Sequence, residues 1–118
     1  ALRLGARSAS CFDIDPQALI ATRDNASANH LSDRVRLCDS AAAIPRGADL
    51  LLANILSGPL VQLAPRFAEI LRPAGALVLS GLMEQDVPEV ELAYGKWFDM
   101  RTFRVRESWV CLRGRRHD

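Results

Sequence analysis

The sequence predicts an α/β protein: a parallel sheet with helices on both faces, closed at its carboxyl end by an antiparallel hairpin. Short apolar runs of strand length alternate along the chain with segments of helical periodicity. One of these runs, 49–53, leads directly into the polar residue Asn54. The last two strand-like runs are joined only by the short segment around Glu107, which is too short for a parallel crossover.

Composition limits the possible classes of protein. With 118 residues, 49% of them hydrophobic and 25% charged, the chain has the composition of an ordinary globular protein, and residues 1–118 form one domain at most. No apolar run approaches the roughly 20 residues of a transmembrane helix, and no signal peptide is recognisable, so no membrane partner is expected and the expected location is cytoplasmic. A net charge of +1 gives no overall basic field, so no direct nucleic-acid partner is predicted.

The cysteines and histidines do not suggest a metal site. Cys11, Cys38 and Cys111 are odd in number, far apart and set in apolar runs, which favours reduced core thiols over disulfides. His30 and His117 have no partner at a metal-binding spacing. We therefore predict that the chain binds no metal.

The first third of the chain predicts a strand, a helix and a second strand. Residues 1–6 are typical of a last helical turn closed by Gly5, and residues 8–14 form a strand. Asp15 as N-cap and Pro16 at the first helical position then begin a helix that runs to about Asn29. The next strand is 35–38. The chain begins with Ala1 in mid-element, which we interpret as a sign of a fragment of a longer protein.

The middle of the chain continues the alternation. Residues 39–47 form a loop with at most one helical turn, and strand 49–53 is expected to be covered on both faces because four consecutive residues are apolar. An amphipathic helix is predicted over 60–71, with Pro65 either near its first turns or producing a kink.

The final part predicts two strands after a last helix. Residues 72–75, Arg-Pro-Ala-Gly, form a turn before strand 76–80 and Gly81, and a weaker helix spans 85–94. Strands 98–106 and 108–114 then form the hairpin. The aromatic residues of this region could offer a stacking platform for RNA, but core positions are the favoured interpretation. They are Trp97, Phe98, Phe103 and Trp109.

Asn54 is the first candidate site residue. Open parallel sheets bind ligands outside the carboxyl ends of their strands, where Asn54 is expected to lie. Its amide offers a donor and an acceptor that can orient a polar reactant. The alternative is that Asn54 merely caps a turn, a role for which asparagine is also favoured.

A terminal antiparallel hairpin is characteristic of the Rossmann-like methyltransferases that use S-adenosylmethionine, and further residues match that group. Residues 11–16, CFDIDP, resemble its second motif, in which an acidic residue at a strand end accepts hydrogen bonds from the ribose hydroxyls of the cofactor. Asp13 matches that residue. The alternative for Asp13 is a loop or capping role, but Asp15 is the better helix cap. Asp39, with Ser40, follows the next strand, where these enzymes contact the adenine edge. A plain loop position for Asp39 remains open.

The closest resemblance is to the PrmA family, which methylates protein eleven of the large ribosomal subunit. The segments that carry it cover nearly the whole chain: DIDPQALIATRDNASAN, DLLLANILSGPLVQLAP, LRPAGALVLSGL and ESWVCLRGR. Residues 54–56, Asn-Ile-Leu, stand where methyltransferases for glutamine or adenine nitrogen carry Asn-Pro-Pro-Tyr. The resemblance implies S-adenosylmethionine as cofactor, methyl transfer to lysine and N-terminal amines of that ribosomal protein, and a catalytic as well as a cofactor-binding role for Asn54.

Two parts of the family pattern are not found. The glycine-rich loop and first strand of the Rossmann-like fold have no counterpart in the sequence, nor does the module that docks the ribosomal protein. The resemblance thus implies a fold truncated at its N-terminus, and a fragment that is marginal or inactive alone. Other functions stay open: another class I methyltransferase acting on nucleic acid or a small molecule, a nicotinamide-dependent Rossmann oxidoreductase, or a noncatalytic truncated product.

Overall fold

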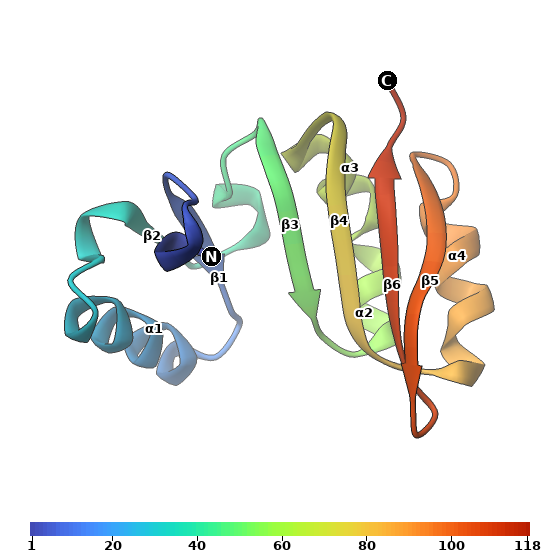
Figure 1. The fold of residues 1–118 in the computed structure, drawn as a ribbon, viewed down its shortest axis with the longest axis horizontal. Coiled ribbons are helices and arrows are strands. Elements are labelled where there is room, and N and C mark those ends of the chain that lie inside the picture. Colours follow the sequence, from blue (N-terminus) through green and yellow to red (C-terminus); the bar gives the residue numbers. More distant parts are fainter. The chain divides into compact units, whose positions relative to one another are not determined.

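The computed structural model describes residues 1–118 and divides them into two compact units, Ala1–Pro45 and Arg46–Asp118 (Figure 1). The first unit holds a two-stranded sheet and the second a four-stranded sheet. No helix in either unit combines the length and the apolar character needed to span a membrane. That residues 1–118 belong to one domain stays a prediction.

The first unit is a strand–helix–strand segment. Its elements are β1 (Ala9–Phe12), α1 (Pro16–Ala28) and β2 (Val35–Cys38). The two strands are parallel, with Phe12 opposite Cys38. β1 is shorter than the predicted strand 8–14, because the side chain of Asp13 turns the chain by accepting a hydrogen bond from the Asp15 backbone N–H at 2.9 Å. The predicted positions of β2 and of Asp15 as N-cap are confirmed.

Arg34 attaches the start of the chain to this unit. Its guanidinium donates to the carbonyl oxygens of Leu2, Ala6 and Arg7. The turn Leu2–Leu4 is a 3₁₀ helix that ends at Gly5 with φ of 112°, as predicted from the glycine. Apart from these bonds the unit has little core of its own, since its buried residues are only Leu2, Ala26 and Cys38.

The second unit packs three helices against one sheet. Its elements are β3 (Ala48–Asn54), α2 (Ser57–Gln62), α3 (Ala64–Ile70), β4 (Leu71–Met83), α4 (Val87–Tyr94), β5 (Phe98–Arg106) and β6 (Trp109–Arg116). The strand order is β3-β4-β6-β5, with β3 and β4 parallel and the other pairs antiparallel. Glu107 and Ser108 both have positive φ and close a two-residue turn, so the predicted terminal hairpin is confirmed.

The predicted single helix 60–71 is instead two short helices. α2 ends and α3 begins around Leu63, and Pro65 occupies the first turn of α3, where its missing N–H costs no hydrogen bond. Leu63 donates its backbone N–H to Pro59 and accepts from Phe67 with its carbonyl oxygen, so both helices remain bonded across the break. The prediction of a proline near the first turns is correct for α3.

The predicted turn 72–75 is an irregularity inside β4. Ala48 pairs with Leu71 and Leu50 pairs with Ala76, so four residues of β4 oppose the single residue Asp49. Nε of Arg72 donates to the Asp49 carboxylate at 2.6 Å across this bulge. The glycine and proline of the segment therefore mark a bulge within the strand and not a turn before it. β4 begins at Leu71, whereas the predicted strand begins at residue 76.

Tyr94 lies at the centre of the helical side of the second unit. It is fully buried, its ring lies 6.4 Å from that of Phe67 and 5.7 Å from that of Phe98, and its hydroxyl donates to the Leu60 carbonyl oxygen at 2.7 Å. Burial raises the pKa of the Tyr94 hydroxyl, so it remains a donor at neutral pH. One side chain thus connects α4 to α2, α3 and β5.

The opposite face of this sheet carries no helix of the unit (Figure 1). Leu77, Leu79 and Leu82 of β4 point to the helical side and are fully buried, whereas Leu50 and Leu52 of β3 are 49% and 62% exposed. The expectations of a strand covered on both faces and of helices on both faces are therefore wrong for this unit. A continuous apolar run did not show that no helix of this unit covers the second face.

Two of the four aromatic residues assigned to the core are also exposed. Phe98 is buried and Trp97 is partly buried, but Phe103 is 61% and Trp109 is 54% exposed. Phe103 is the residue added at a bulge between Thr102 and Arg104, and Trp109 pairs with Met83 on the helix-free face. Strand alternation alone did not reveal the bulge or which face was covered.

The Tyr94→Phe substitution should lower the free energy of unfolding of the second unit by about 1–2 kcal/mol, because the buried Leu60 carbonyl oxygen loses its donor. Both tryptophans belong to this unit, so their fluorescence in a urea titration reports its unfolding. Phe103→Tyr is the control, since it adds a hydroxyl to an exposed ring and should change nothing. Equal stability of wild type and Tyr94→Phe would contradict this assignment.

Candidate functional site

Asp13 and Asp39 lie at the same end of neighbouring strands. Asp13 follows Phe12 at the end of β1, Asp39 follows Cys38 at the end of β2, and Phe12 and Cys38 are register partners. Adjacent parallel strands are about 4.8 Å apart, so the two carboxyl-bearing residues are neighbours. Both are exposed, and together they form an acidic edge at the carboxyl end of the two-stranded sheet.

The side chain of Asp13 has a local role as well. Its Oδ1 accepts from the Asp15 backbone N–H, while Oδ1 of Asp15 accepts from the Gln17 N–H, each at 2.9 Å. Asp15 caps α1, as predicted, whereas Asp13 takes the loop role that was the alternative to a ligand role, because its bond shapes the loop before the helix. A carboxylate has about four acceptor positions, so the bond to Asp15 leaves Asp13 free to accept others.

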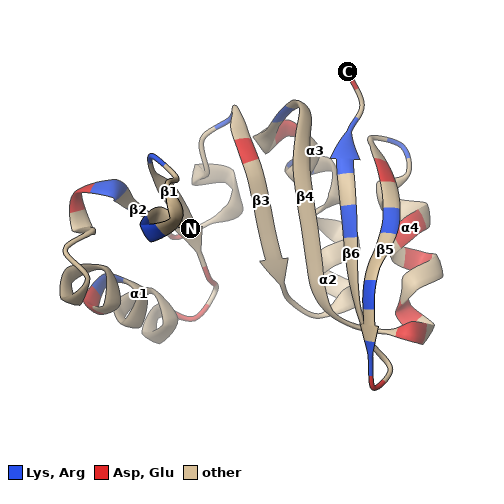
Figure 2. Cartoon of the chain, in the orientation of Figure 1, with Lys and Arg blue, Asp and Glu red and all other residues tan.

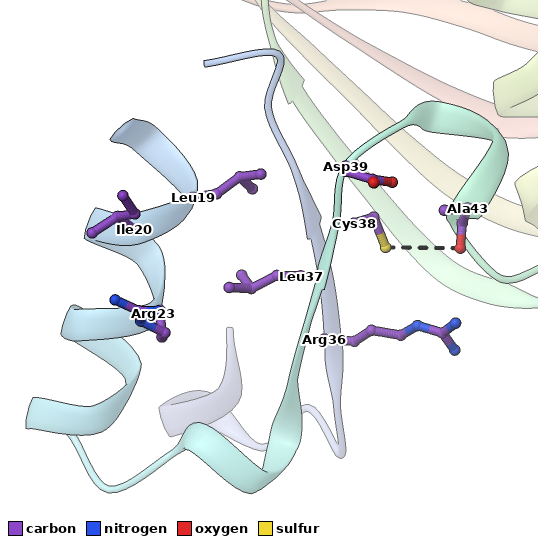
Figure 3. Close-up of a pocket in the computed structure, with 8 residues that line it drawn as sticks. All are labelled: Leu19, Ile20, Arg23, Arg36, Leu37, Cys38, Asp39 and Ala43. Atoms are coloured by element: carbon purple, nitrogen blue, oxygen red, sulfur yellow. Dashed lines mark hydrogen bonds between the residues drawn. The ribbon is translucent and has the colours of Figure 1, made fainter. Parts of the chain in front are cut away.

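A pocket of about 400 Å³ lies beside this edge, between α1 and β2 (Figure 3). Leu19 and Leu37 point into the space between helix and strand, whereas Arg36 and Cys38 leave β2 on its other side. The residues that line the pocket are Leu19, Ile20, Arg23, Arg36, Leu37, Cys38, Asp39 and Ala43. Its lining combines apolar side chains with one carboxylate, Asp39, and two guanidinium groups, Arg23 and Arg36.

Among the predicted cofactor residues only Asp39 lines this pocket. Ser40 begins the 3₁₀ turn Ala41–Ala43, and its side chain makes no capping hydrogen bond. The apolar residues Leu19, Ile20 and Leu37 were not identified as site residues from the sequence. Ile20 and Leu37 are 41% and 37% exposed, and only the packing of α1 beside β2 shows that they share one hollow.

The Cys11 thiol is not an activated nucleophile. Burial raises its pKa, and the neighbouring Cys38 thiol raises it further. All three cysteines are free, but the expected core position holds only for Cys38, since Cys11 and Cys111 are partly buried. The structure brings together no group of three or more His, Cys, Asp or Glu side chains that could hold a metal ion.

Asn54 is the last residue of β3 in the second unit and pairs with Ser80 of β4. It is exposed, and its side chain forms no hydrogen bond within the chain. Without such a bond the Asn54 side chain caps no turn, and the N-cap of α2 is Leu56, so the structure does not support the capping alternative. Its amide is free to contact a ligand at the carboxyl edge of the sheet.

Gly81 supports the Asn54 side chain and was not recognised as a site residue from the sequence. It has a φ of 79° and lies at a bulge where Ser80 and Gly81 oppose the single residue Cys111. A Cβ at Gly81 would collide with Oδ1 of Asn54. The signal in the sequence is the glycine that directly follows strand 76–80, at a strand end where a close backbone approach requires glycine.

Ile55 and Leu56 differ in exposure. Ile55 is partly buried, while the side chain of Leu56 is 76% exposed at the start of α2. The Leu56 side chain is therefore not a packing residue of the core of this unit. It presents an apolar surface two residues after Asn54.

Comparison with known proteins gives a consistent result. The family model described as ribosomal protein L11 methyltransferase (PrmA) matches residues 1–117. The chain is 48% identical over 117 residues to ribosomal protein L11 methyltransferase of Pseudomonas aeruginosa and 43% identical over 120 residues to that of Aeromonas salmonicida. The two matches include 98% and 99% of this chain, respectively. The chain spans only 40% of the length of either relative.

Solved structures show the same fold. A ribosomal protein L11 methylase from Lactobacillus delbrueckii subsp. bulgaricus superposes with a TM-score of 0.90 and 28% identity, covering 100% of this chain and 62% of that one. An S-adenosylmethionine-dependent O-methyltransferase from Thermotoga maritima gives a TM-score of 0.76 at 10% identity, over 94% of this chain and 50% of that one. The α/β fold is therefore that of S-adenosylmethionine-dependent methyltransferases.

Gly81→Ala should displace the Asn54 side chain, because the added methyl group meets Oδ1 of Asn54. We expect a large shift of the Asn54 side-chain amide resonances in a ¹⁵N correlation spectrum. Gly47→Ala is a matched control: Gly47 also has positive φ, at 91°, but nothing lies within 4 Å of a Cβ built there. The control should cost only about 1 kcal/mol of backbone strain and leave Asn54 unmoved. Unchanged Asn54 resonances in Gly81→Ala would contradict the contact.

Proposed function

Because the chain belongs to the ribosomal protein L11 methyltransferase (PrmA) family, we propose that it forms part of an enzyme that transfers methyl groups from S-adenosylmethionine to ribosomal protein L11. The observation that carries the proposal is the family match over residues 1–117, nearly the whole chain. Lysine side-chain amines and an N-terminal amine are the proposed acceptors. The three free cysteines suit a reducing compartment, and we place the enzyme in the cytoplasm.

The first unit is proposed to bind the cofactor. Asp13 would accept hydrogen bonds from the ribose hydroxyls, since a carboxylate can accept from both. Asp39 and Ser40 would meet the adenine edge, with Leu19, Ile20 and Leu37 against the ring. The pocket of about 400 Å³ supports this fit, because its apolar side chains can contact the faces of a ring and the Asp39 carboxylate can accept from an amino group at its edge.

The second unit is proposed to present Asn54 to the reacting groups. The cofactor supplies an activated methyl group, so the protein has mainly to align a neutral amine and exclude water. A free lysine amine has a pKa of about 10.4 and must lose its proton before attack, which desolvation favours. The unpaired amide of Asn54 would orient either the acceptor amine, through its carbonyl oxygen, or the methionyl end of the cofactor, and Leu56 would provide an apolar wall.

The catalytic domain is proposed to need further sequence. β1 pairs only with β2, and β3 pairs only with β4, so each has one edge of unpaired backbone groups. Unpaired strand edges are unfavourable when buried and prone to association when exposed. We propose that the first strand and glycine loop of the fold come from upstream sequence, and that residues 1–118 alone are inactive. The unmatched part of the curated relatives leaves room for this segment and for a module that docks L11.

Asp13→Asn in a version extended upstream should weaken S-adenosylmethionine binding about 10- to 100-fold, because a charged acceptor is lost from two hydrogen bonds. Isothermal titration calorimetry measures this loss, with NAD as a second ligand. Asp33→Asn is the control, since Asp33 is an exposed aspartate of the same unit that precedes β2 and so lies away from the carboxyl ends of the strands. Equal affinity of Asp13→Asn and wild type would exclude Asp13 as a ligand, and tighter binding of NAD would overturn the cofactor assignment.

Asn54→Ala in the same extended protein should chiefly lower kcat, by about 10- to 100-fold, because the acceptor amine is no longer held in line with the methyl group. Transfer of labelled methyl groups to purified L11 gives kcat and KM. Gln62→Ala, at the end of α2, is the control for loss of an amide elsewhere in the unit. An unchanged kcat with a raised KM for S-adenosylmethionine would assign Asn54 to cofactor binding alone.

A further inference from the structure

The helix-free face of the four-stranded sheet has two chemically different halves. The half formed by β3 and β4 is apolar, with Leu50, Leu52, Ala76 and Val78. On β6, Val110 and Leu112 are buried on the helical side, so strand alternation places Cys111, Arg113 and Arg115 on the free face. Figure 2 shows the basic residues following one another along β5 and β6.

The register identifies the arginines of this second half. Arg101 is opposite Arg113, Arg104 is opposite Cys111 and Arg106 is opposite Trp109, so all of them share the free face. We name this set the basic face. Its members are Arg101, Arg104, Arg106, Arg113 and Arg115, and every one is exposed.

The chain itself does not neutralise the basic face. None of its five arginines forms an ion pair, and Arg115 bonds only to the Ala74 carbonyl oxygen at 3.4 Å. Asp99, the acidic neighbour on β5, is bonded to His117 at 3.1 Å. The pairing of Arg101 with Arg113 destabilises the hairpin, because two positive charges lie directly opposite each other on neighbouring strands. An open hollow of about 300 Å³ lies among Arg101, Arg113 and Arg115, with the Asp99 carboxylate at its lining as well, so three guanidinium groups face one carboxylate.

Exposed aromatic rings accompany the arginines. Trp109, 54% exposed, pairs with Arg106, and Phe103, 61% exposed, lies at the bulge before Arg104. Aromatic rings beside arginines in a basic groove are the means by which proteins bind single-stranded nucleic acid: the rings stack on bases and the guanidinium groups contact phosphates. An acidic protein segment would use the charges and leave the rings without a role.

We propose that the basic face binds a single-stranded RNA segment, with its phosphates along Arg101, Arg113 and Arg115 and a base stacked at Trp109. An apolar segment is a poor occupant of this half, because it would bury five arginines without partners. The choice of RNA over DNA rests on the proposed ribosomal substrate. RNA binding is nevertheless measured without methyl transfer, so failure of this proposal and failure of the enzymatic function are distinguishable.

The test is fluorescence anisotropy of a labelled 20-nucleotide RNA with the full-length protein over a range of salt concentrations. The three phosphate contacts at Arg101, Arg113 and Arg115 predict a slope of log K against log salt of about −2. Arg101→Gln combined with Arg113→Gln should make the slope less steep by about 1.4 and weaken binding about tenfold or more at low salt. Trp109→Ala should weaken binding about tenfold with an unchanged slope, because stacking carries no charge.

The matched control combines Arg46→Gln with Lys96→Gln. It removes two positive charges from the same unit outside the basic face, and should leave the slope within error of wild type. Four outcomes would overturn the proposal: no RNA binding by the full-length protein, an equal loss in the control, tighter binding of DNA of the same sequence, or equal competition by polyglutamate. The last would assign the face to an acidic protein.

Discussion

The pairing of β4 on both of its edges is the constraint on which the second unit depends. β4 is parallel to β3 on one side and antiparallel to β6 on the other, so it joins the αβ part of the chain to the terminal hairpin. Leu77, Leu79 and Leu82 of β4, the last of them after the bulge at Gly81, are fully buried against the helices. A one-residue change of register would expose all three and bury the opposite face, so the apolar pattern fixes the pairing. The two bulges of β4 then change its local direction where Asp49 and Asn54 lie.

The candidate site follows from the ends of the parallel strands. β1, β2 and β3 are followed by, or end in, Asp13, Asp39 and Asn54, and at those ends the backbone leaves the sheet and its polar side chains reach solvent. The same physical rule explains why Gly81 belongs to the site. The Asn54 side chain can extend over β4 only because Gly81 has no Cβ. The bulge at Gly81 therefore helps to determine the position of the Asn54 amide, the candidate catalytic group.

The helix-free face of the four-stranded sheet combines two surfaces of different chemistry. Its apolar half and its arginine half lie on one surface of the same four strands, and they need different environments. Leucines gain free energy when covered, at about 25 cal/mol per Å² of apolar surface, whereas arginines need anions or water. The boundary lies between β4 and β6, where the sheet changes from parallel to antiparallel pairing.

The sequence by itself determined the order of the elements, the cap at Asp15, the terminal hairpin and the family, because each depends on local residue chemistry or on a contiguous motif. The positions of Asp13, Asp39 and Asn54 at strand ends were also predictable, because each follows or ends a strand-like run. Their roles as site residues stay predictions. Only the tertiary structure decided that 60–71 is two helices, that 72–75 lies within β4, that Gly81 supports Asn54, and that Phe103 and Trp109 are exposed. These features depend on register, bulges and on which face the helices cover, and those are set by contacts between residues far apart in the sequence.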